Sequence, residues 1–216
     1  MDVAPSVDTV YQAIRTLHYD TEVHAKEKAS IWLGEFQKSV FAWSISDALL
    51  REDRDLESSY FAAQTMRTKI QSSFHELPPE SYEALRESLF SHFSTSGSAT
   101  NHVIVIQLCL AVADLYLQVP AWKNCVVEII DRFQKSSTDI GILLEILAFL
   151  TEELVHSRLR IGENRRSEIR NEFLPHATML LSFLVVFRNI CPNHTLYITN
   201  RNFFANLILN IALANY

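Results

Sequence analysis

Glycine and proline are scarce in this sequence, with 4 Gly and 6 Pro among 216 residues. Phosphate-cradling loops and tight β-hairpin turns both depend on glycine, because their backbones adopt conformations that other residues tolerate poorly. The chain contains no Gly-rich nucleotide-binding motif and no Asn-Gly or Asp-Gly turn. These absences exclude the common nucleotide-binding motifs and disfavour a sheet built from hairpins.

Cysteine and long apolar runs are also scarce. The three thiols of Cys109, Cys125 and Cys191 are odd in number and far apart, which predicts buried free thiols in a reducing compartment. No apolar run reaches the roughly 18 residues that a membrane span needs, and the first residues lack the pattern of a signal peptide. We therefore expect a soluble protein of the cytoplasm or nucleus with no membrane contact.

Motifs for catalysis or metal binding are missing as well. The 8 His residues are scattered without His-Glu-x-x-His spacing, and no Cys-x-x-Cys or Gly-x-Ser-x-Gly motif occurs. His102 and His176 lie beside apolar runs, which predicts partly buried, hydrogen-bonded side chains. The net charge of −6 disfavours a general nucleic-acid binder, which needs a basic face. We predict no enzymatic activity, no cofactor, no metal site and no direct nucleic-acid contact.

The chain is 48% hydrophobic, and hydrophobic residues at helical spacing are abundant in it. From residue 79 onward the helix breakers recur roughly every 20 residues, so helix pairs recur at the roughly 40–47-residue period of HEAT and armadillo repeats. The pattern predicts an all-α fold: a right-handed α-solenoid of HEAT-like antiparallel helix pairs, about four and a half of them.

The helices can be placed individually from their apolar faces and breakers. Ser6 is a predicted N-cap, and Pro79 suits the first turn of a helix, where its missing N–H costs nothing. The last helix is expected to run without interruption. The expected helices cover residues 6–19, 21–39, 41–51, 56–74, 79–93, 103–119, 122–133, 140–154 and 166–190.

A polar stripe remains on alternate predicted helices once their apolar faces are assigned. In a solenoid the second helix of each pair lines the concave surface, so the stripes would form a continuous strip facing a partner. A solvated face of any amphipathic helix has the same pattern, and spacing does not separate the two readings. The stripes contain Glu27, Ser30, Gly34 and Gln37; Glu57, Gln64, Thr68 and Gln71; Gln107, Asp114 and Gln118; and Glu145, Glu152 and His156.

A cluster of arginines lies between residues 158 and 170. Guanidinium groups pair well with phosphate, so a phosphate or nucleic-acid site is one reading. Glutamates interleave with the arginines and no aromatic residue for stacking lies nearby, which favours a salt-bridged loop between repeats. The cluster comprises Arg158, Arg160, Arg165, Arg166 and Arg170, with Glu152, Glu153, Glu163 and Glu168.

Several separate segments resemble, in the right order, the N-terminal part of transportin-SR receptors. These belong to the importin-β (karyopherin) superfamily and import serine/arginine-rich splicing factors into the nucleus. One matching motif is Ala42-Trp43-Ser44-Ile45-Ser46-Asp47; the others are residues 10–13, 26–35, 60–73, 107–115 and 155–166.

The resemblance implies a HEAT-repeat nuclear transport receptor that shuttles between nucleus and cytoplasm. Its N-terminal repeats would bind the GTP-loaded small GTPase Ran. Phenylalanine-rich (FG) nucleoporins would be engaged elsewhere along the solenoid, and SR-protein cargo would require further C-terminal repeats. Within the predicted strip, we expect four central Ran-binding residues and four flanking ones: Gln64, Arg67, Thr68 and Gln71, then Glu27, Gln37, Gln107 and Asp114.

The predicted organisation has two parts. Residues 1–190 form the N-terminal HEAT-repeat region, of the importin N-terminal and exportin-1-like type, and residues 191–216 form a divergent tail. Receptors of the family are several-fold longer, so the resemblance implies a truncated chain. Two alternatives stay open: a generic helical-repeat scaffold for protein interactions, and a truncated product without function.

Overall fold

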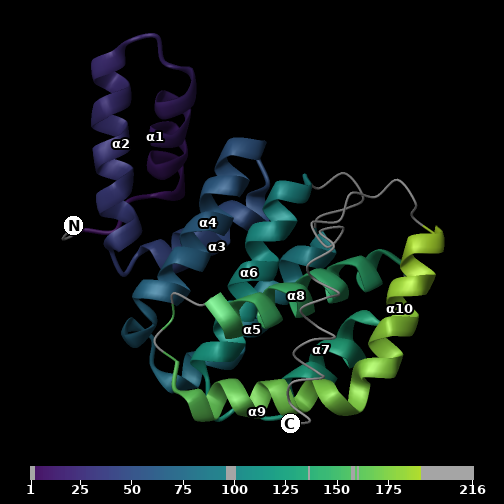
Figure 1. The fold of residues 1–216 in the computed structure, drawn as a ribbon. Helices are drawn as coiled ribbons and strands as arrows, with labels where there is room; N and C mark the ends of the chain where they lie inside the picture. Colours follow the sequence, from purple (N-terminus) through teal and green to yellow (C-terminus); the bar gives the residue numbers. More distant parts are fainter. Residues whose placement is uncertain (1–2, 96–100, 136, 157–158, 160, 191–216) are drawn as a thin grey trace. The chain divides into compact units, whose positions relative to one another are not determined.

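Helices are the regular secondary structure throughout the part of the chain that the computed structural model describes, namely residues 3–95, 101–135, 137–156, 159 and 161–190 (Figure 1). This part contains ten α-helices and no strand. Successive helices pack in pairs, which confirms the predicted α-solenoid of HEAT-like repeats. The pairs include α1 (Val7–Tyr19) with α2 (Val23–Lys38), α3 (Ala42–Glu52) with α4 (Leu56–Ser72), and α7 (Cys125–Phe133) with α8 (Ser137–His156).

The chain divides into two compact units, Met1–Ala111 and Val112–Tyr216. The first unit contains α1 to α4, the 3-10 turns η1 (Phe74–Glu76) and η2 (Pro79–Ser81), and α5 (Tyr82–Thr95). Helix α6 (His102–Gln118) spans the boundary. The second unit continues with α7, α8, α9 (Glu163–Phe173), the 3-10 turn η3 (Leu174–His176) and α10 (Ala177–Ile190).

Side-chain caps fix the beginnings of two helices in the first unit. Ser6 caps α1 as predicted, because its Oγ accepts a hydrogen bond from the Thr9 amide at 3.0 Å. Asp55 caps α4 by accepting from the Ser58 amide at 2.9 Å, and its other carboxylate oxygen accepts from the Tyr11 hydroxyl of α1. The second cap therefore also joins α1 to the start of α4.

Small residues set the packing distance between α3 and α4. Ala62 and Ala63 of α4 are completely buried, as is Leu49 of α3. A methyl side chain lets the neighbouring backbone approach closely, so a larger residue here would force the helices apart. Phe36 of α2 and Met66 of α4 are also almost fully buried and belong to the core of this unit.

A polar cluster links α3 to α5. The Asp47 carboxylate accepts hydrogen bonds from Ser88 and lies 2.9 Å from His92 Nε2, while Arg51 approaches its other oxygen at 2.9 Å. Partial burial on its own raises the pKa of the Asp47 carboxyl, but the bonds with His92 and Ser88 outweigh burial and lower that pKa to about 2. The ionised form is therefore the one that suits the folded protein.

The second unit departs from the sequence prediction at its last helix. The predicted continuous helix over residues 166–190 is wrong, because the structure has α9, the turn η3 and then α10 (Figure 1). Pro175 lies in η3 and explains the break, since proline has no amide hydrogen and its ring clashes with the carbonyl four residues earlier. Helix α10 then packs against α8.

The predicted burial is confirmed for two of the cysteines and for both histidines. Cys109 and Cys125 are free thiols with no exposed surface, and His102 and His176 are partly buried. Cys191 and the predicted tail 191–216 lie outside the described residues. Among the residues described, no helix is long and apolar enough to cross a membrane.

Acid should destabilise the protein partly through Asp47. A carboxyl whose pKa falls from 3.8 to about 2 on folding stabilises the fold above pH 4, and this contribution is lost as the pH falls from about 4 to 2. The contribution is on the order of 2 kcal/mol. Denaturant unfolding between pH 2 and pH 7 should show Asp47→Asn less stable than the parent at pH 5 and above, with the difference vanishing near pH 2.

The control is Glu83→Gln, at an exposed position on α5. Its unfolding free energy should follow the parent at every pH. Parallel curves for Asp47→Asn and the parent over the whole range would contradict the assignment of the cluster as a stabilising contact.

Candidate partner-binding surface

Two neighbouring helices of the first unit carry most of the predicted partner-binding residues. On α4, Gln64 and Thr68 are exposed one turn apart, and Arg67 and Gln71 lie half-buried beside them. On α2, Glu27 is exposed and Gln37 is half-buried. We call this set the α2–α4 strip: Glu27, Gln37, Gln64, Arg67, Thr68 and Gln71.

Direct contacts bring the two halves of the α2–α4 strip together. The Gln37 Nε2 of α2 donates a hydrogen bond to the Thr65 Oγ1 of α4 at 2.9 Å. The ring of Phe36 stacks on that of Phe61 across the same helix pair, with centroids 6.3 Å apart. Helices from two successive pairs are thus held side by side, as the repeat prediction requires of a concave surface.

The α2–α4 strip is nearly neutral. It holds one carboxylate, Glu27, which lies 3.7 Å from the His24 ring nitrogen, and one guanidinium, Arg67. The hydroxyl of Thr68 donates to the Gln64 carbonyl at 2.9 Å, so it is already oriented along the helix. Amide and hydroxyl groups of this kind favour shape-matched hydrogen bonding over attraction by net charge.

The predicted strip does not extend unchanged along α6. Gln107 is half-buried, but Asp114 has no exposed surface, and Glu145 on α8 is only 2% exposed. Gln107 and Asp114 are seven residues apart, and this spacing predicts that they share one exposed face of α6. Helix α6 is instead apolar nearly all round, and such a helix is covered by neighbours on most sides. The proposals below therefore omit Asp114.

Two aromatic residues flanking the strip were not predicted as part of it. Trp32 and Phe61 are half-buried, and the Trp32 ring stacks on Phe36 with centroids 6.1 Å apart. Both positions fit the apolar face of their helix, so spacing assigns them to the core. Their partial exposure depends on tertiary packing, which the spacing does not encode.

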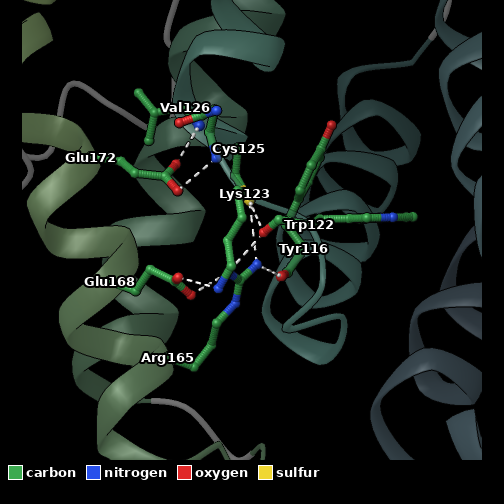
Figure 2. Close-up of polar contacts among 9 residues, drawn as sticks. Tyr116, Trp122, Lys123, Cys125, Val126, Arg165, Glu168 and Glu172 are labelled. Atoms are coloured by element: carbon green, nitrogen blue, oxygen red, sulfur yellow. Dashed lines mark hydrogen bonds and ion pairs between the residues drawn. The ribbon is translucent and has the colours of Figure 1, made fainter.

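The arginine cluster is a structural clamp within the second unit. Arg165 is buried on α9, and its guanidinium donates to the carbonyls of Tyr116 at 2.7 Å and Trp122 at 2.9 Å (Figure 2). It also contacts Cys125 Sγ at 3.3 Å and the Glu168 carboxylate at 2.8 Å. Because these acceptors occupy the guanidinium, Arg165 is not available to a phosphate ligand.

The clamp continues along the same face of α9 to Glu172. Its two carboxylate oxygens accept from the backbone amides of Asn124 at 2.9 Å and Val126 at 3.0 Å, at the beginning of α7 (Figure 2). Asn124 has a left-handed backbone with φ of 58°, a conformation that asparagine tolerates better than most residues. Negative charge at a helix N-terminus also complements the helix dipole.

The remaining arginines of the cluster have structural partners as well. Arg166 donates to the Glu153 and Leu154 carbonyls near the end of α8, and Arg170 pairs with Glu163 at 3.0 Å. The predicted loop is therefore partly a helix, although its predicted salt bridges exist. Arg158 and Arg160 lie outside the described residues.

Neither a reactive thiol nor a metal centre emerges from the residues described. Burial raises the pKa of the Cys125 thiol to about 11, even though the Arg165 guanidinium opposes the shift, so the thiol stays protonated. No group of three or more potential metal ligands lies together in the described part of the chain.

Comparisons with known proteins point to one superfamily. Residues 29–95 match the importin-β N-terminal domain family, and residues 101–209 match the family described as exportin 1-like protein. Importin-13 of Bos taurus is 32% identical over 173 residues, which cover 76% of this chain and 18% of that protein. Human importin-13 is 32% identical over 162 residues, which cover 71% of this chain and 17% of that protein.

A plant relative gives a similar result. Transportin MOS14 of Arabidopsis thaliana is 29% identical over 182 residues, which cover 82% of this chain and 19% of that protein. The chain therefore spans slightly less than a fifth of the length of these relatives. These names describe importins and a transportin, which fits the predicted lack of enzymatic activity.

Removing the Arg165 guanidinium should destabilise the second unit strongly. Arg165→Leu leaves two carbonyls without their donor, at a cost of about 2–5 kcal/mol in the free energy of unfolding. Denaturant unfolding followed by circular dichroism measures the loss, and Cys125 should become accessible to a thiol reagent at lower denaturant concentration. The control is Arg170→Leu, which removes a more exposed ion pair and should cost about 1 kcal/mol or less. Equal losses of stability for the two substitutions would contradict the conclusion that Arg165 stabilises the second unit.

Proposed function

Because the chain belongs to the importin-β superfamily, we propose that it serves as the N-terminal part of a nuclear import receptor and binds Ran-GTP through the α2–α4 strip. The observation that carries the proposal is the pairing of α2 and α4 through Gln37 and Thr65. The contact joins two successive repeats beside the exposed Gln64 and Thr68 of α4, which supports a partner site shared by both repeats.

The composition of the α2–α4 strip supports a folded protein partner. The strip supplies neutral hydrogen-bonding groups at Gln64 and Thr68, and the neighbouring Trp32 and Phe61 outside the strip are partly exposed aromatic residues. Aromatic residues are enriched where protein interfaces are buried, and amides supply directional hydrogen bonds around them. A nucleic acid would instead need a strongly basic surface.

Membership of the importin-β superfamily also supports a proposal for the role of this chain in nuclear transport. We propose that residues 1–190 act as the Ran-binding region of a receptor that shuttles between cytoplasm and nucleus. The transportin-SR group is the proposed branch, with FG nucleoporins as further partners. Serine/arginine-rich cargo would be bound only together with further repeats. The name transportin MOS14 of one relative supports this branch, and the importin-13 relatives represent the competing one.

Binding to Ran tests the proposal directly. The full chain, immobilised, should retain Ran loaded with a non-hydrolysable GTP analogue and should not retain Ran-GDP. Thr68→Arg places a bulky charge at the centre of the neutral α2–α4 strip and should weaken binding at least tenfold, equivalent to ~1.4 kcal/mol or more. Biolayer interferometry measures both affinities.

The matched control is Glu83→Arg, at an exposed position on α5 outside the α2–α4 strip. It introduces the same residue and should leave the affinity unchanged. Absence of Ran-GTP retention at micromolar protein would exclude the proposed function. Equal losses for both variants would exclude the α2–α4 strip as the site.

A further inference from the structure

A buried lysine lies on α4 between two residues of the α2–α4 strip, Thr68 and Gln71. Lys69 of α4 is 1% exposed, and its ammonium contacts the Glu76 carboxylate of η1 at 2.5 Å. It also donates to the Ser39 carbonyl at 3.0 Å and lies 5.5 Å from the centre of the Trp43 ring. The Trp43 indole N–H donates in turn to Glu76 at 3.0 Å, so the polar groups form one connected network.

This network joins four consecutive elements of the first unit. Ser39 is the C-terminal cap of α2, Trp43 belongs to α3, Lys69 to α4 and Glu76 to η1. The Ser39 carbonyl lies at the negative end of the α2 dipole, where a cation is favoured. Lys69 therefore ties the end of α2 to a defined point on α4.

Stability alone does not account for an ion pair at this position. Desolvating two charges costs about as much as their attraction returns, and apolar replacements of similar volume are often neutral or stabilising. Hydrogen bonds differ from the apolar contacts of Met66 and Ile70 on the same face of α4 because they are directional. A directional contact fixes the rotation of a helix, whereas apolar packing tolerates small rotations.

The position of Lys69 in the sequence makes that rotation relevant to the α2–α4 strip. Lys69 follows Thr68 and precedes Gln71 by two residues. With roughly 100° between successive residues, an inward Lys69 leaves Gln71 nearly on the opposite side of α4 and Thr68 about a quarter turn away, where it is exposed. Lys69 also holds the end of α2 two residues beyond Gln37. Both helices of the strip are therefore oriented by one side chain.

We propose that Lys69 is a positioning residue, which sets the rotation and spacing of α2 and α4 so that Gln37, Gln64 and Thr68 form one binding surface. The identity of the bound partner, Ran-GTP, rests on the proposed function above. The positioning of the two helices does not depend on it.

The test replaces the ion pair with apolar residues of similar size. The variant Lys69→Met with Glu76→Leu should keep a cooperative unfolding transition, with a modest fall in Tm because the Trp43 indole N–H loses its acceptor. Its affinity for Ran-GTP should nevertheless fall at least fivefold. Hydrogen exchange should become faster in residues 35–38 and 64–72 of the free protein. The control is Ile70→Val, which should lower the Tm slightly and leave both affinity and exchange in these segments unchanged.

The outcomes distinguish a role of Lys69 in positioning α2 and α4 from a role in stability alone. Parent affinity and parent exchange rates in the double variant would overturn the proposal. If the double variant lacks a cooperative transition, the test uses Glu76→Gln, which removes the counter-charge of Lys69 and keeps the shape of the side chain. Faster hydrogen exchange in residues 35–38 and 64–72 then supports the positioning role, and unchanged exchange overturns it. If the parent itself does not bind Ran-GTP, the proposed function fails, while the exchange comparison still decides whether Lys69 positions the helices.

Discussion

This fold depends on finding hydrogen-bond donors for the backbone carbonyl groups at the ends of its helices. The last turn of a helix leaves its carbonyls without partners inside the helix, and a repeat protein turns sharply at these ends into the next helix. In each unit a buried cation meets this requirement: Lys69 at the Ser39 carbonyl after α2, and Arg165 at the Tyr116 carbonyl in the last turn of α6. Arg165 also binds the Trp122 carbonyl in the connection from α6 to α7. Glu172 supplies the counterpart for amide groups where α7 begins. Charged side chains therefore complete the backbone bonding where apolar packing cannot.

Local signals in the sequence were sufficient for most of the fold. The Ser6 cap and the apolar spacing of α1 depend only on neighbouring residues, and both were predicted correctly. The break at Pro175 was missed because a proline can either kink a helix or end it, and the residues on both sides of it are compatible with helix. In the structure the 3-10 turn η3 connects α9 directly to α10.

The candidate site was less accessible to sequence reasoning, because helical spacing defines faces and not what covers them. Gln64 and Asp114 have similar positions in their stripes, yet Gln64 is exposed and Asp114 is buried. The difference lies in tertiary packing around α6. The roles of Lys69 and Arg165 were equally hidden, since their acceptors are backbone carbonyls, which every sequence position provides. Residues 165, 168 and 172 are spaced so that they lie on one face of α9. This spacing was the only sign in the sequence that the three side chains act together.

The reach of the α9 clamp along the chain has a consequence for synthesis on the ribosome. Glu172 lies 46 residues after Val126 and 48 after Asn124, whose amides it caps, and Arg165 lies 49 residues after Tyr116. At roughly 5–20 residues per second, translation of this interval takes on the order of 2–10 s. For that time the turn from α6 into α7 has emerged, or is emerging, without the side chains that complete it. A chaperone that recognises unfinished backbone and apolar surface would meet the nascent chain in that interval, whereas the Ser6 cap of α1 is complete as soon as Thr9 has emerged.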